Sequence, residues 1–247
     1  MSNKIMQFLI ALLGFCVVEA NAHDLVVTST SNFREDATIE SEIILKLTPG
    51  DELFLLEANK HNGYYRALHK DGGVGWVWGS NVVIYPEYVK SDWRHWIDVD
   101  GDCQTTRDEV LIEESEIPVT FKTNNNCIVE SGRWTDPYTG EIFTDPKELD
   151  IDHMVPLRNA HRSGGWEWTY QMKSGYANYM AHPEHLIAVK ASATRSKGAK
   201  GPDEWLPDNQ QYRCQYVKDW DAIKNRWNLN LTESEIITIQ EVKSTCP

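Results

Sequence analysis

The stretch LDIDHMVPL, residues 149–157, decides the predicted fold of the C-terminal region of this chain, residues 91–247. Its apolar residues predict a short β-strand, and Pro156 ends that strand because proline cannot donate to a strand ladder. Asp152 and His153 stand at the strand's end, so their side chains leave opposite sides of the backbone yet stay close in space. A carboxylate can hold a divalent cation there, and an imidazole, with an ordinary pKa of about 6.5, can take a proton from water. Most Asp-His pairs are simply surface loop residues, so the assignment depends on the surroundings of this one.

A second apolar stretch, HLIAV at residues 185–189, leads into a basic segment. Between Leu186 and Gly201 the chain has four basic residues and no acid, and these are Lys190, Arg195, Lys197 and Lys200. In a chain of net charge −13 this is a local reversal of sign. A basic turn that opens a helix beside a metal and a general base is typical of phosphodiester sites. The alternative is a solvated basic face.

Composition excludes several classes of protein. The chain has 247 residues, of which 41% are hydrophobic and 25% charged, so it is no disordered chain and has room for one large domain or two small ones. Apolar residues form a long run only at the N-terminus, which excludes a polytopic membrane protein. The net charge of −13 disfavours adhesion to nucleic acid or anionic lipid by charge alone, because like charges repel.

The first segment is predicted to be an export signal. Residues 1–22 contain Lys4 in a positive n-region, an apolar run over residues 8–18, and an Ala-Asn-Ala cleavage site ending at Ala22. An uncleaved anchor helix is the alternative. The mature protein is expected to be secreted or periplasmic, with no membrane segment after cleavage.

Cysteine usage agrees with export. Cleavage would leave an even number of cysteines, which in an exported chain indicates disulfides. More than one connectivity is possible, and the local pairs Cys103–Cys127 and Cys214–Cys246 are favoured because neither crosses the segment that carries Asp152. A zinc site is the alternative, although the chain has no C-x-x-C pair.

Residues 23–88 have the pattern of a small all-β module, in which short strands alternate with turn signals. NFR (32–34), PGDEL (49–53), GYY (63–65) and GGVGWV (72–77) resemble the bacterial SH3 domain, which implies a small barrel. Such modules commonly bind other chains, so a cell-wall peptide or a protein ligand is expected for this region. Its groove would be lined by Tyr64, Tyr65, Trp76 and Trp78. The alternative is that these rings fill the barrel.

Residues 91–247 carry a longer series of motifs. They are RHWIDVDGDCQTTRDEVL (94–111), GRWTDPYTG (132–140), DHMVPL (152–157), SG (163–164), LIAV (186–189), RSKG (195–198) and PDEWLP (202–207). With these motifs the region resembles the HNH, or ββα-metal, nucleases, and within them the secreted HNH-like family related to the GmrSD restriction-endonuclease C-terminal domain. The predicted fold class is therefore α+β: a small all-β SH3-like barrel followed by an α+β HNH-type ββα-metal nuclease domain.

The resemblance also implies roles for individual residues. His153 falls at the general base, and Asp152 falls at a ligand of a single divalent metal ion, expected to be Mg²⁺ with Mn²⁺ as the alternative. Arg195 and Lys197 fall where substrate phosphates are held. His185 falls at the position that orients the site. The implied reaction is hydrolysis of phosphodiester bonds in nucleic acid, DNA before RNA. Sequence specificity is expected to be low, because the basic surface is small and no base-reading helix is evident.

One position departs from the family pattern. The second metal ligand of the family is an Asn directly before the RSKG turn, and this chain has Thr194 there. A threonine hydroxyl is a poorer ligand than an amide carbonyl. Either Thr194 binds weakly or through water, or His182 or His185 replaces it, or activity is reduced or lost. The alternative function is therefore a catalytically degenerate HNH scaffold that binds cell wall or a partner through its SH3-like domain. A peptidoglycan hydrolase is a third interpretation, disfavoured because the cysteines look paired.

Overall fold

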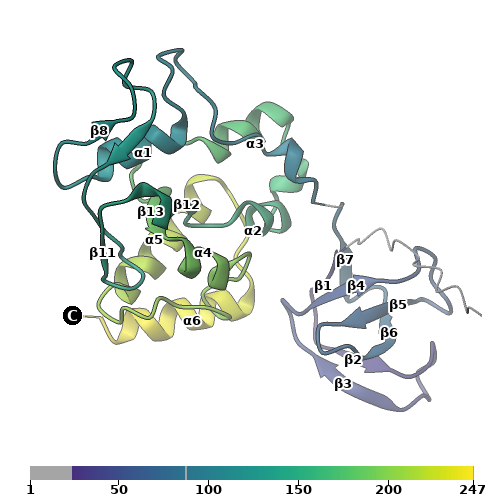
Figure 1. Cartoon of the computed structure of the whole chain (residues 1–247). Coiled ribbons are helices and arrows are strands. Elements are labelled where there is room, and N and C mark those ends of the chain that lie inside the picture. Colours follow the sequence, from purple (N-terminus) through teal and green to yellow (C-terminus); the bar gives the residue numbers. More distant parts are fainter. Residues whose placement is uncertain (1–23, 87, 247) are drawn as a thin grey trace, which may run out of the picture.

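The computed structural model describes residues 24–86 and 88–246, and Figure 1 shows an N-terminal sheet joined to a larger region of helices and short strands. This mixed α+β architecture confirms the predicted fold class at that level. The predicted signal peptide, residues 1–22, lies outside the described residues. No described helix is both long and apolar enough to cross a membrane.

The N-terminal region is one antiparallel sheet of seven strands in the order β3-β2-β6-β5-β4-β1-β7. The strands are β1 (Asp24–Val27), β2 (Ser31–Arg34), β3 (Ile43–Leu47), β4 (Glu52–Leu55), β5 (Tyr64–His69), β6 (Val74–Trp78) and β7 (Val82–Ile84). Alternation along the strands buries Phe33, Ala67 and Val77 on one face. Position 75 of β6 requires glycine, because a Cβ there would lie 2.8 Å from the Arg34 carbonyl oxygen of β2.

The sheet is open, whereas the sequence predicted a closed barrel. Among the described strands β3 pairs only with β2, and β7 pairs only with β1, so these two strands form the edges. Short strands and turn signals are shared by open and closed sheets, so the sequence pattern could not decide closure. The SH3-like identity of this region stays a prediction.

The second region has its elements in the following order. They are η1 (Lys90–Asp92), α1 (Thr106–Glu114), β8 (Thr120–Phe121), β9 (Val129–Ser131), β10 (Trp134–Thr135), β11 (Ile142–Phe143), η2 (Pro146–Glu148), β12 (Leu149–His153), α2 (Leu157–Arg162), η3 (Gly165–Glu167), α3 (Tyr170–Ala177), β13 (Leu186–Lys190), α4 (Ala191–Lys197), α5 (Arg213–Arg226) and α6 (Glu233–Ser244). The strands of this region are paired two by two.

The pair β12–β13 is the centre of the second region. The strands run antiparallel, with Asp152 opposite Ile187 and His153 opposite Leu186, and α4 follows β13 without a loop. Leu186 faces an apolar cluster that includes Leu111 of α1, whereas Ile187 faces the cluster built on α5. Because cross-strand partners share a face, Asp152 and His153 lie on opposite faces of this ribbon.

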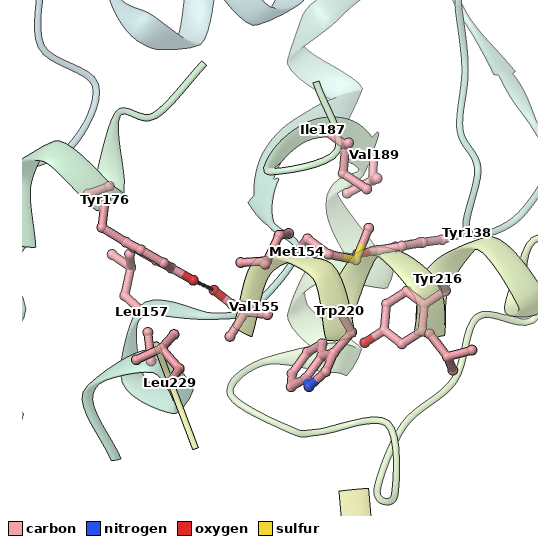
Figure 2. Close-up of a cluster of buried hydrophobic side chains, with 14 of the residues drawn as sticks. Tyr138, Met154, Val155, Leu157, Tyr176, Ile187, Val189, Tyr216, Trp220 and Leu229 are labelled. Carbon is pink, nitrogen blue, oxygen red and sulfur yellow. Dashed lines mark hydrogen bonds between the residues drawn. The ribbon is translucent and has the colours of Figure 1, made fainter. Parts of the chain in front are cut away.

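The larger apolar cluster fixes the chain directly after β12. Figure 2 shows Met154 and Val155 among the rings of Tyr138, Tyr216 and Trp220. The Tyr176 hydroxyl donates to the Val155 carbonyl oxygen at 2.7 Å, which satisfies a backbone group in a segment where strand pairing has ended. The strand end that carries Asp152 and His153 is therefore held rigidly.

Two disulfides and a buried ion pair cross-link the second region. Disulfides join Cys103 to Cys127 and Cys214 to Cys246, and so confirm the favoured local connectivity. The Lys224 ammonium of α5 donates to both carboxylate oxygens of Glu235 in α6 at 3.0 Å, and both side chains are almost fully buried. The same Glu235 closes a capping box at the start of α6.

Candidate active site

A pocket of about 350 Å³ runs beside β12 and contains Asp152, His153 and Thr194. Residues 150–153 all line it, although alternate residues of a strand point to opposite faces. They can do so because β12 pairs only with β13 among the described strands, which leaves its other edge open. The structure thus brings together three predicted site residues: His153, the predicted general base, Asp152, the predicted metal ligand, and Thr194, which stands where the family has Asn.

The hydrogen bonding of His153 defines its tautomer. Its Nε2 lies 2.9 Å from the Ala177 carbonyl oxygen at the end of α3, and a carbonyl can only accept, so Nε2 carries the proton. No described residue forms a hydrogen bond with Nδ1, which is left with its lone pair. Burial lowers the pKa of His153 to about 3, with a smaller opposing effect from the Ala177 carbonyl. The ring is therefore neutral at pH 7.

Two further aromatic residues, for which no role was predicted, surround this ring. Trp96 stacks on His153 with ring centroids 5.3 Å apart, and His95 meets it edge-on at 6.2 Å. Trp96 has a φ of 55°, a left-handed conformation that is strained for a bulky side chain. Both residues lie in the family-like motif at residues 94–111, which is the only feature of the sequence that could have pointed to a place in the site. The backbone conformation that turns Trp96 toward His153 has no sequence signature.

Asp152 is held by two donors. The Tyr138 hydroxyl donates to its Oδ2 at 2.7 Å, and the Lys197 ammonium donates to the same oxygen and, at 2.8 Å, to the His153 carbonyl oxygen. Asp152 Oδ1 accepts no hydrogen bond from the described residues. One carboxylate oxygen is thus fixed, and the other is left for a ligand.

Lys197 lies elsewhere than the resemblance implied. It was expected to hold a substrate phosphate, but its side chain is 0% exposed and its ammonium pairs with Asp152. The reason is helical geometry: Thr194 and Lys197 are three residues apart, so both face β12. Arg195 faces outward with a side chain that is 71% exposed, 4.0 Å from a carboxylate oxygen of Asp150.

Thr194 has a hydroxyl that is buried and has no hydrogen-bond partner among the described residues. This oxygen and Asp152 Oδ1 are hard donors, the type that Mg²⁺ prefers, and Mg²⁺ usually keeps several waters beside a few protein ligands. The two residues therefore fit a sparsely coordinated hard cation. Among the described residues, one group of three potential metal ligands lies close together. It consists of Asp98, Asp100 and Asp102, in an exposed turn outside this pocket.

His185 is fully buried and does not line the pocket. Its Nε2 lies 2.8 Å from the Tyr176 carbonyl oxygen, one residue before the carbonyl that His153 binds. The two histidines thus hold consecutive carbonyls at the end of α3. His182, the other possible replacement for the missing Asn, lines a separate cavity with Glu113. Neither histidine therefore replaces the missing ligand from its present position.

Burial of His185 predicts an acid-sensitive fold. Burial lowers its pKa to about 4, below the ordinary value near 6.5, so between these two pH values only the unfolded state binds the proton. Stability should therefore fall as pH falls, by about 1.4 kcal/mol per pH unit from this group. Between pH 6.5 and 5, wild type should lose about 2 kcal/mol more than His185→Gln in urea titrations. Equal losses in both proteins would contradict the assignment.

Comparison with known proteins places the second region in a family. A family model for the C-terminal domain of GmrSD restriction endonucleases matches residues 105–239, which include Asp152, His153 and Thr194. A protein of Arthroderma benhamiae, described as an uncharacterized secreted protein, is 35% identical over 172 residues, which cover 68% of this chain and 82% of that protein. The chain therefore belongs to the family of GmrSD restriction endonuclease C-terminal domains.

Proposed function

We propose that this protein is an exported, metal-dependent endonuclease of the HNH type, which hydrolyses phosphodiester bonds of DNA, or of RNA, with low sequence specificity. The main support is the antiparallel pair β12–β13 followed directly by α4, with Asp152, His153 and Thr194 around one pocket. The family described as restriction endonucleases supports a nuclease, and the relative described as secreted supports export.

His153 acts as the general base in this proposal. Its Nδ1 takes a proton from the attacking water, while the Ala177 carbonyl accepts from Nε2 and keeps the ring in one orientation. A ring with a pKa of about 3 takes a proton poorly in the free enzyme. The negative charge of a phosphodiester bound beside it favours the protonated ring and raises that pKa toward the working range.

Asp152 and Thr194 would hold one divalent cation, Mg²⁺ first and Mn²⁺ as the alternative. When bound, such a cation would supply positive charge to neutralise the phosphoryl group and the leaving oxygen. Lys197 and Tyr138 act on Asp152, because both donate to its Oδ2 and so fix the carboxylate. They are positioning residues, and Arg195 on the outer face of α4 is left to contact substrate phosphates.

A degenerate scaffold that binds a partner is the second candidate function. It is favoured by a cavity of about 1010 Å³ over the N-terminal sheet, lined by Tyr64, Trp78 and Ile39. Tyr65 and Trp76, which were also expected in a groove, are not among the described lining residues. In this candidate the SH3-like region is the functional part, and the cell-wall or protein ligand stays a prediction.

Nicking of a supercoiled plasmid distinguishes the two candidates. The mature, oxidised protein should nick DNA with Mg²⁺ or Mn²⁺, lose activity in EDTA, and show a steep decline with salt because binding is mainly to phosphates. The same preparation would be assayed for binding to isolated cell wall. Cell-wall binding without nicking under any of these metal conditions would reject the nuclease in favour of the degenerate scaffold.

Thr194→Asn should strengthen the proposed metal site. An amide carbonyl in place of the buried, unpartnered hydroxyl is expected to lower the Mg²⁺ concentration for half-maximal nicking by about tenfold, or about 1.4 kcal/mol. Ser192→Asn on the exposed part of the same helix is the matched control and should leave that concentration unchanged. If the two variants have the same metal requirement, Thr194 is not a ligand position.

A further inference from the structure

We propose that Lys90 and Arg158 form a phosphate-binding subsite in the wall of the pocket, where they hold a backbone phosphodiester next to the one that is cleaved. The inference rests on the proposed nuclease function and identifies further substrate-binding residues for it. Lys90 precedes the family match at residues 105–239, and Arg158 belongs to none of the basic positions that the resemblance identified.

The first argument is the pairing of the basic residues. Two side chains of the basic segment after β13 form close ion pairs, Lys190 with Glu141 and Lys197 with Asp152, whereas the exposed Arg195 lies 4.0 Å from Asp150. Lys90 and Arg158 line the same pocket as His153, and neither forms an ion pair with any described residue. Lys90 and Arg158 therefore carry charge that can still neutralise a phosphate at this pocket, whereas the charge of Lys197 is already neutralised by Asp152.

The second argument is the placement of the Arg158 guanidinium. It lies over the ring of Tyr88, with its central carbon 5.6 Å from the ring centroid. Its Nε is buried and has no hydrogen-bond partner in the described parts of the chain. A buried donor without a partner costs free energy, and an arginine fork fits two phosphate oxygens. The guanidinium of Arg158 is thus fixed over Tyr88, and a bound anion could accept the hydrogen bonds that it does not make to the described residues.

The third argument is the charge balance of the pocket. Asp150 and Asp152 are its acidic lining residues, and Arg195 and Lys197 lie beside them. Arg107 also lines the pocket, but its guanidinium donates to the carbonyl oxygens of Pro146 and Leu149. Arg195 and Lys197 offset the charges of these two acids, so the charges of Lys90 and Arg158, which are unpaired among the described residues, can attract an anionic nucleic-acid backbone to the pocket. They do so although the protein as a whole has a net charge of −13.

Binding of a short fluorescein-labelled DNA duplex to the full mature protein in EDTA tests the subsite. Lys90→Gln and Arg158→Gln should each weaken binding by about tenfold and lower the slope of log Kd against log salt by about one. Arg158→Lys should keep the slope, because it keeps the charge, but bind less tightly than wild type. Lys218→Gln, at an exposed position of α5, is the matched control and should bind as wild type does.

The outcomes separate this inference from the proposed function. If wild type binds and, with Mg²⁺, cleaves DNA while Lys90→Gln and Arg158→Gln behave like Lys218→Gln, the subsite is rejected and the nuclease stands. If wild type neither binds nor cleaves DNA, the proposed function is rejected and the subsite with it. Weaker binding by both Lys90→Gln and Arg158→Gln, with unchanged binding by Lys218→Gln, supports the subsite.

Discussion

Replacement of His153 by alanine is expected to lower the rate of metal-dependent plasmid nicking by about 10²–10⁴-fold, because it removes the proposed general base. The neutral ring has its Nε2 proton held by the Ala177 carbonyl, so Nδ1 is the nitrogen available to a water molecule. His153→Gln is expected to be as inactive, since an amide cannot take the proton. The rate would be measured from the loss of supercoiled plasmid at fixed Mg²⁺.

An exposed histidine provides the control for this prediction. His61 lies in the N-terminal sheet region, 3.3 Å from a carboxylate oxygen of Glu57, and His61→Ala should nick DNA at the wild-type rate. Far-ultraviolet circular dichroism and urea midpoints would show that the His153 variants remain folded. A folded His153→Ala protein with wild-type activity would exclude this residue as the base.

Lys224→Met is expected to destabilise the protein by about 3–5 kcal/mol, the usual cost of leaving one member of a buried ion pair alone. The Lys224 ammonium donates to Ser163 Oγ at 2.7 Å, to the Asn230 carbonyl oxygen at 2.9 Å, and to both Glu235 oxygens. Without it, the Glu235 carboxylate would be buried with no cation beside it. Urea unfolding with both disulfides intact measures the change.

The same two helices contain a matched surface pair. Lys243 of α6 and Asp221 of α5 are 2.6 Å apart, but their side chains are 38% and 29% exposed, against 1% and 2% for Lys224 and Glu235. Lys243→Met should therefore change stability by less than about 1 kcal/mol. The double variant Lys224→Met/Glu235→Gln should recover part of the loss, because no charge then remains buried. Equal effects of the two lysine substitutions would contradict the role of burial.

The strand pair and the local disulfides could be predicted from the sequence. The apolar runs at residues 149–157 and 185–189 are buried on both faces, and a fully buried strand leaves such a run in the sequence. Asp152 and His153 leave opposite sides of the backbone, as strand geometry requires. Cysteine parity and spacing were enough to favour Cys103–Cys127 and Cys214–Cys246.

The partners of the charged residues could not be predicted. A run of basic residues in a sequence usually indicates a solvent-exposed surface. Lys197 is nevertheless buried, because the carboxylate of Asp152, on another element, compensates for the loss of hydration of its ammonium group. Arg158 and Lys90 stand in segments with no phosphate-binding pattern, and only the tertiary fold brings them to the pocket. Pairing over long sequence separations depends on packing that no local pattern records.

The segment before α1 has a consequence for exchanging parts between relatives. Trp93 is fully buried and contacts the rings of Trp168 and Tyr176, and Tyr88 packs against Trp93. A chimaera that joins a foreign N-terminal module at residue 105 would therefore remove Trp93 from the core of the second region, together with Tyr88 and Lys90 from the lining of its pocket. Recombination boundaries should fall upstream of Tyr88, where the transplanted half keeps its own interior.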